Sequence, residues 1–274
     1  MQDRNTVAKR PASGVGAAPP LTARSVLAST LLGVAPPELP VAYLVHMGAL
    51  FGINENRARV ALSRMVASGE VTTDGAGRYR LSGHLLERQH RQVASRSGRT
   101  RRWPGSWVLA VVMTAGSTAE VRTRRRRALL LARLAELREG VWMRPDNLDL
   151  ELGDDLASDV AVFTGATPAD PGHTAAKLWD LDGWATRAED LLGQLESLPP
   201  GHPSDLAPGF VLSAAVLRHL QSDPLLPDEL LPSRWPGERL RRVYDDWDAR
   251  YRQVLAQWGP AAVDTRRGRA DRRG

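Results

Sequence analysis

The segment from Leu21 to Leu81 most constrains the fold, because it combines three helical patterns with a β-hairpin in one short stretch. Apolar residues recur at helical spacing in residues 23–34, 41–51 and 54–68. Residues 70–73 and 78–81 are β-prone, and the glycines of the intervening Asp74-Gly75-Ala76-Gly77 turn can adopt positive φ. The order of three helices and then a hairpin predicts a winged helix-turn-helix.

The third helix, residues 54–68, has recognisable ends. Asn54 is a good N-cap, and Gly69 is a good residue to follow the last turn. We expect its buried side to be formed by Val60, Leu62, Met65 and Val66. The polar residues then face outward.

In a helix-turn-helix, the second helix of the pair enters the DNA major groove. Arginine can bind a guanine edge, asparagine an adenine edge and serine a phosphate. The predicted DNA-binding residues are therefore Asn54, Asn56, Arg57, Arg59, Ser63, Arg64, Arg78 and Arg80. The last two share one face of the hairpin, where they would neutralise phosphates. The competing interpretation is a structural helical domain with a solvated arginine face.

The charge is unevenly distributed, although the whole chain carries only +6. Arginine and lysine are in excess in residues 1–102, 103–139 and 232–274, whereas aspartate and glutamate are in excess in residues 140–231. This distribution favours a polyanion-binding module attached to a body that does not bind DNA. An arginine excess caused by GC-rich coding would explain the same charge without function.

The middle of the chain reads as a small α/β unit. The apolar run from Trp107 to Met113 predicts a strand buried on both faces. A helix is expected over residues 121–138, followed by strands over 141–143 and 159–163. This order suggests a ferredoxin-like fold.

The remainder reads as helical. Helices are predicted over residues 177–192, 208–220 and 239–258. Four prolines prevent a long helix over residues 223–237. Trp179, Trp184, Trp235 and Trp247 are expected in the core rather than around a ligand.

The expected organisation is α+β and multidomain. Its units are a disordered tail (1–20), a winged helix-turn-helix (21–95), a ferredoxin-like domain (103–170), a helical C-terminal domain (175–260) and a disordered basic tail (261–274). The sequence has no cysteine and no long apolar run. We therefore expect a cytoplasmic protein without a membrane span.

Several motifs in order resemble the PaaX family of bacterial transcriptional regulators. They are LTARSVLASTLLG, GINENRARVALSRMVASGEV, RRWPGSWVLAVV, LREGVWMRPDNL, KLWDLDGW and SDPLLPDELLPSRWPG. The resemblance runs from Leu21 to Trp258 and implies a winged helix, a Cas2-like ferredoxin domain and a helical C-terminal domain. It also implies a homodimeric repressor of a catabolic operon, bound to a palindromic double-stranded operator and released by an aryl- or acyl-CoA effector. The short wing and residues 114–124 depart from the family pattern.

A run of arginines offers a candidate site for that effector. Residues 124–127 would lie in the first turns of the helix predicted over residues 121–138, where the helix dipole disfavours positive charge. A compensating anion is therefore expected, and the phosphates of CoA would fit Arg124, Arg125 and Arg127. DNA, the acidic middle segment or plain solvation are the alternatives.

The competing functional class is a Cas2-like nucleic-acid-processing enzyme. Such a nuclease would need a carboxylate at the end of the first middle strand, which instead reads Val112-Met113-Thr114-Ala115-Gly116. The six histidines show no metal-ligand spacing, and no phosphate-binding loop motif occurs. We therefore expect neither catalysis nor a resident metal or cofactor.

Overall fold

The computed structural model describes residues 21–258 apart from residues 115, 151, 154–155 and 157. The tails expected at 1–20 and 261–274 lie outside the described residues. The fold is α+β, with two antiparallel sheets.

The N-terminal lobe holds three helices and a three-stranded sheet. The helices are α1 (Ala23–Leu32), α2 (Val41–Ala49) and α3 (Glu55–Ala67). The sheet runs in the order β1 (Glu38–Pro40), β3 (Arg78–Leu81), β2 (Val71–Thr73). The predicted hairpin is β2–β3. No sequence pattern predicts β1, because three residues containing a proline are too short to show alternation.

Helix α3 lies where the sequence predicts it, but the prediction that Val60 and Val66 are buried is wrong. The Asn54 side chain accepts a hydrogen bond from the backbone N–H of Arg57 at 2.9 Å, which caps the helix. Its buried residues are Ala58, Ala61, Leu62 and Met65. Val60 and Val66 are instead 43% and 36% exposed, because the side of α3 that packs against α1, α2 and β2 is the one that carries the four buried residues.

The middle lobe is a four-stranded antiparallel sheet with one described helix, α5. Its elements are β4 (Trp107–Val112), α5 (Ala119–Leu131), β5 (Ala135–Arg138), β6 (Val141–Pro145) and β7 (Val160–Ala166), with the strand order β5-β6-β4-β7. The helix predicted to continue to residue 138 is wrong beyond Leu131. Arg133 adopts a φ of 61° that ends the helix, and Gly140, at a φ of 75°, turns β5 back into β6.

The C-terminal lobe is helical. Its helices are α7 (Pro171–Leu178), α8 (Leu181–Ser197), α9 (Leu206–Gln221) and α10 (Gly237–Trp258), with two 3-10 turns, η1 (Pro203–Asp205) and η2 (Asp228–Leu230). One helix predicted over 177–192 is in fact two, because Asp180 caps a new helix by accepting from the N–H of Gly183. Residues 223–237 form no long helix, as predicted. Trp235 stacks on Trp184 with ring centroids 4.5 Å apart and fastens this segment to α8.

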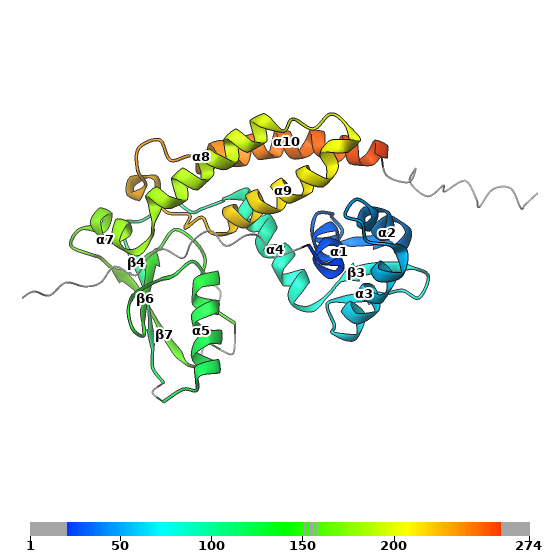
Figure 1. Ribbon diagram of the computed structural model, residues 1–274. Coiled ribbons are helices and arrows are strands. Elements are labelled where there is room, and N and C mark those ends of the chain that lie inside the picture. Colours follow the sequence, from blue (N-terminus) through cyan, green and yellow to red (C-terminus); the bar gives the residue numbers. More distant parts are fainter. Residues whose placement is uncertain (1–20, 115, 151, 154–155, 157, 259–274) are drawn as a thin grey trace, which may run out of the picture.

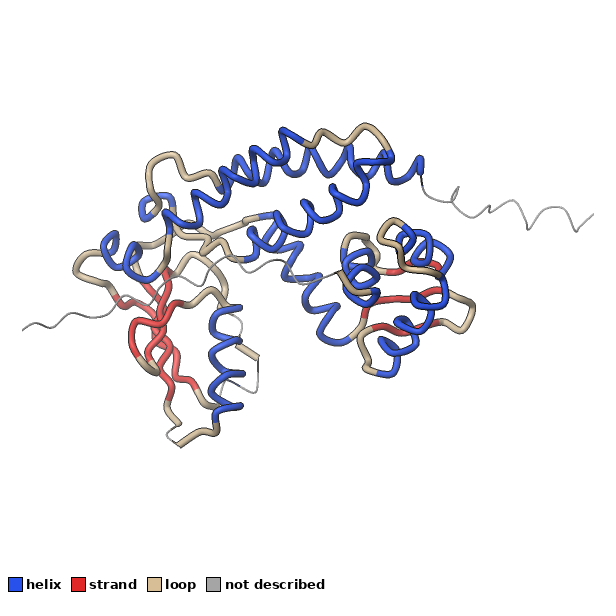
Figure 2. The backbone as a smooth tube through the Cα atoms, viewed as in Figure 1, coloured by secondary structure: helices blue, strands red, loops and turns tan. Residues whose placement is uncertain are grey.

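Helix α4 (Gly83–Ser97) links the lobes. Figure 1 shows α1–α3 on one side, the β4–β7 sheet with α5 on the other, and α8, α9 and α10 across the top. Figure 2 shows the two sheets well separated, beneath the long helices. Helix α4 packs against both α1 and α9, so it joins the N-terminal lobe to the C-terminal helices.

Buried polar contacts join the three lobes near the end of α4. The Arg133 guanidinium donates to the Ser95 hydroxyl at 2.8 Å. Arg241 of α10 pairs with Asp223 at 2.8 Å, and the Asp223 side chain is only 2% exposed. Arg144 is fully buried, and this burial lowers its pKa to about 10. Arg133 also donates to the Asp223 carbonyl oxygen, so one guanidinium joins the middle lobe to both α4 and the C-terminal lobe.

Candidate nucleic-acid interface

The outward side of α3 is a continuous exposed face. With 3.6 residues per turn, Asn56, Val60 and Ser63 lie opposite the buried side of the helix. Arg57 and Arg64 are also exposed and flank this row on one side. The helix packs against α1, α2 and β2, and Figure 1 shows it on the side of the lobe away from α8–α10. An incoming duplex could therefore reach this face.

The predicted arginines of α3 differ in their partners. Arg59 forms an ion pair with Glu55 one turn earlier, at 2.7 Å. Arg57 and Arg64 have no carboxylate partner within the described part of the chain. A guanidinium without an internal partner keeps all its donors for phosphate or guanine. These two arginines are therefore the strongest candidates for contacting DNA.

The two hairpin arginines lie together, as their alternation predicted, but they share one carboxylate. Arg78 and Arg80 donate to Glu38 of β1 at 2.5 and 2.7 Å. Their hydrogen bonds, first from Arg78 and then from Arg80, hold the pKa of Glu38 below its ordinary value. Both guanidinium groups remain at least half exposed. The sequence pattern did not identify Glu38 as the partner of these arginines. Its negative charge halves the net positive charge that Arg78 and Arg80 offer to phosphates.

A groove runs between the outward face of α3 and the start of α1. Its residues are Thr22, Ala23, Arg24, Asn56, Arg57, Val60, Ala61, Arg64, Met65, Ser68 and Glu70. Arg24 donates to Glu70 at 2.8 Å, and this pairing lowers the pKa of the carboxyl group. Sequence analysis did not assign Arg24 or Val60 to the interface, because each fits an ordinary amphipathic helix.

The arginines of α5 are arranged differently from the prediction. Helix α5 starts at Ala119, so residues 124–127 lie beyond its first turn and the helix-dipole argument for a bound anion is wrong. Arg125 is buried and donates to the Thr114 hydroxyl at 3.0 Å. Arg124 and Arg127 are exposed. Their role in effector binding stays a prediction.

Two further features bear on the class of protein. No helix among residues 21–258, as far as these are described, is long and apolar enough to cross a bilayer. Within the same residues, His, Cys, Asp and Glu side chains form no group of three that could hold a metal ion. His46 of α2 lies at a lobe interface, where the centroid of its ring is 3.9 Å from the ring centroid of Trp258 in α10.

Comparisons with known proteins place the chain in a family. Residues 22–85 match the family described as PaaX-like protein, and residues 179–262 match the PaaX-like protein C-terminal domain. The structure resembles a solved chain, uncharacterized protein Rv0674 from Mycobacterium tuberculosis, with 43% identity and a TM-score of 0.66. The match covers 85% of this chain and 99% of that one. No curated protein matches the sequence. The chain belongs to the PaaX-like family.

Proposed function

We propose that the protein is a DNA-binding transcriptional regulator whose N-terminal lobe is a winged helix-turn-helix. The observation that carries this proposal is the exposed face of α3, where Arg57 and Arg64 flank Asn56, Val60 and Ser63. Arginine and asparagine can read base edges, and an exposed valine can contact a thymine methyl group. Hairpin β2–β3 would be the wing, with Arg78 and Arg80 near the DNA backbone.

The rest of the proposal concerns assembly and regulation. In our proposal, β4–β7 with α5 form the ferredoxin-like domain, and two copies of the chain form a homodimer. Edge strand β7 supports pairing of two copies, because Val162 and Phe163 are 43% and 53% exposed and the strand carries no charge. A dimer would present its two α3 helices to half-sites ~34 Å apart in a palindromic operator. The regulator would repress a catabolic operon until an aryl- or acyl-CoA effector releases it.

A footprinting experiment tests the DNA-binding step. The probe is the DNA upstream of the protein's own gene, with a shuffled sequence of equal length as competitor. The proposal predicts a protected palindrome and a binding constant that falls steeply with salt. Equal affinity for both sequences at every salt concentration would contradict it.

The enzyme alternative has no observation in its favour. Strand β4 ends at Val112 and continues with Met113 and Thr114, none of which supplies a carboxylate. Regulation is therefore the function that we carry forward.

A further inference from the structure

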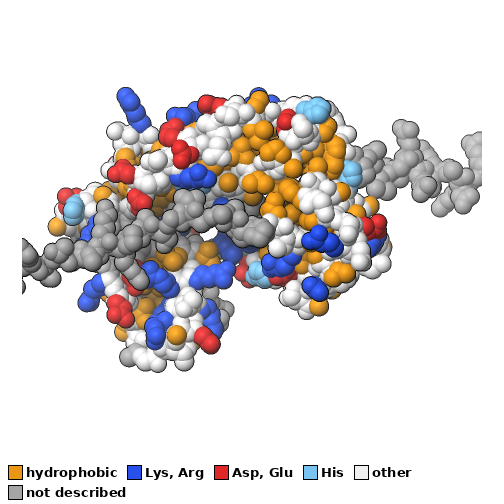
Figure 3. Space-filling model, in the orientation of Figure 1, with side chains coloured by type: hydrophobic (Ala, Val, Ile, Leu, Met, Phe, Trp, Pro, Cys, Tyr) orange, Lys and Arg blue, Asp and Glu red, His pale blue; other side chains and the backbone are white. Residues whose placement is uncertain are grey.

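A cavity of about 410 Å³ lies where the N-terminal lobe meets the C-terminal helices. Its floor comes from α1, the loop after α1, and α2, while one wall is α4 and the roof is α9 and α10. In Figure 3, hydrophobic atoms gather on the visible face where these two lobes meet. The volume lies within the ~300–1,000 Å³ that small-ligand pockets usually have.

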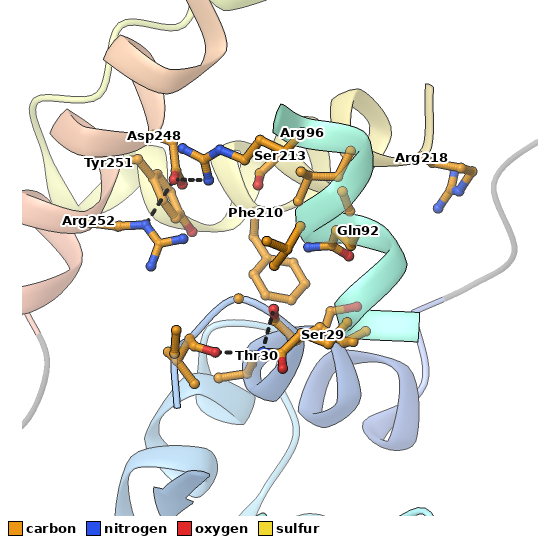
Figure 4. Close-up of a pocket in the computed structure, with 18 of the residues that line it drawn as sticks. Ser29, Thr30, Gln92, Arg96, Phe210, Ser213, Arg218, Asp248, Tyr251 and Arg252 are labelled. Carbon is orange, nitrogen blue, oxygen red and sulfur yellow. Dashed lines mark hydrogen bonds and ion pairs between the residues drawn. The ribbon is translucent and has the colours of Figure 1, made fainter. Parts of the chain in front are cut away.

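The cavity walls are mostly apolar. The large apolar and aromatic side chains are Tyr43, Met47, Phe210, Leu217, Tyr251 and Leu255. Figure 4 shows Phe210 in the middle of the pocket, above Ser29 and Thr30 of α1. Such walls favour an apolar group, because its transfer out of water is the main source of binding energy.

Four arginines line the cavity, and two of them have no carboxylate partner in the described part of the chain. Arg96 and Arg252 both line the cavity, but each donates to Asp248, at 2.8 and 2.9 Å. Arg88 of α4 and Arg218 of α9 also line it, and neither forms an ion pair with any described carboxylate.

The unpaired arginines influence each other. Partial burial lowers the pKa of Arg88 most, followed by the unpaired guanidinium group of Arg218 and then by Arg91 and Arg24, which pair with Glu87 and Glu70. Neighbouring like charges are unfavourable unless an anion lies between or beside them. The edge of the cavity that carries Arg88 and Arg218 therefore favours a negatively charged group.

We propose that this cavity binds an amphipathic anion, with its acyl or aryl group against Phe210 and Leu217 and its anionic group at Arg88 and Arg218. A free carboxylic acid and an acyl-CoA share this chemistry. The acyl part alone would fill the cavity in both cases, because a whole CoA is too large for it. For CoA, the charged part would lie outside, along the arginine rim.

The position of the cavity also suggests how a ligand would act on DNA binding, and this step rests on the function proposed above. The cavity floor belongs to the lobe that carries α3, and its roof belongs to the body. Gln89 of α4 is buried and donates to the Val34 carbonyl at 2.6 Å, which ties the floor to the connecting helix. A ligand that contacts floor and roof together would favour one orientation of α3 relative to the rest of the dimer.

Isothermal titration of the full-length protein tests the site directly, with octanoate and octanoyl-CoA as the two probes. Two variants target it: Arg88→Ala/Arg218→Ala removes the charges, and Ala214→Phe fills the space from a lining position on α9. A third variant, Arg124→Ala/Arg127→Ala, tests the α5 arginines as the competing effector site. The matched control is Arg138→Ala/Arg242→Ala, which removes two exposed charges that do not line the cavity. Thermal unfolding of each variant without ligand checks that it folds.

The proposal predicts that at least one probe binds the natural protein. Either targeted variant should weaken this binding by about tenfold or more, since a charge-assisted contact or the apolar volume is lost. The α5 variant and the matched control should both bind as the natural protein does. If octanoate binds, the ligand is a free acid; if only octanoyl-CoA binds, the ligand is a thioester.

Three results would overturn the site: neither probe binds, the targeted variants bind unchanged, or only the α5 variant loses binding. The charge variant keeps the test decisive if Ala214→Phe does not fold. DNA footprinting of the same proteins without ligand is a separate readout. If the protein binds the ligand but protects no operator even when ligand is absent, the cavity site stands and the proposed function is refuted.

Discussion

Val60 and Leu62 lie two residues apart on α3 and give the sharpest prediction, because both look like core residues in the sequence. Leu62 is 0% exposed and Val60 is 43% exposed. Leu62→Ala removes a fully buried group and leaves a cavity, which costs about 2–5 kcal/mol of unfolding free energy. Val60→Ala removes a smaller group that is partly in water, so at about 0.8 kcal/mol per buried CH₂ the cost stays at or below about 1 kcal/mol.

The two variants should also differ from each other in how they affect operator binding. Val60 lies on the face that we propose to enter the major groove, where it can contact a thymine methyl group. Val60→Ala should therefore weaken operator binding by about fivefold, or about 1 kcal/mol, while hardly changing stability. Urea unfolding followed by circular dichroism gives the first quantity and a gel-shift titration gives the second. If Val60→Ala destabilised the protein as much as Leu62→Ala, the structure of α3 described above would be wrong.

Three further changes test the fold. Asp223→Asn should cost about 3–5 kcal/mol in urea unfolding, because it leaves Arg241 buried without its charge partner; an unchanged midpoint would contradict the pairing. Gly209→Ala should cost about 1–3 kcal/mol, since a Cβ there would lie 2.6 Å from a tyrosine ring of α10; no change in Tm would contradict that contact. Arg24 holds the pKa of Glu70 below its ordinary 4.5, so the stability from this pair is complete above that pH and is lost as pH falls through the lower folded-state pKa. Glu70→Gln should reduce this acid-dependent loss, and an unchanged pH profile of the unfolding midpoint would contradict it.

The sequence predicted most helices and strands, and the errors have physical causes. Helix α3 was placed well because Asn54 and Gly69 mark its ends. The end of α5 was misplaced because Ala132, Leu134 and Ala135 continue a helical pattern. The tertiary pairing of β5 with β6 overrides that local preference.

The candidate interface was predicted by residue type but not by partner. Side-chain pairing across elements, such as that of Arg78 and Arg80 with Glu38, depends on strand register that no local pattern encodes. The lobe-junction cavity was not predicted at all. Its lining comes from five helices that are far apart in the chain, so only their packing brings Arg88 near Arg218.

The central claim is that α3 reads DNA, and one salt-dependent titration tests it most directly. Operator affinity is measured over a range of salt for the natural protein, for Arg57→Ala, for Arg64→Ala and for the control Arg187→Ala on α8. We predict that each α3 variant loses about 1–3 kcal/mol of specific binding, and that the α8 control binds normally. If all four proteins bound the operator with the same affinity and salt slope, α3 would not be the DNA-reading helix.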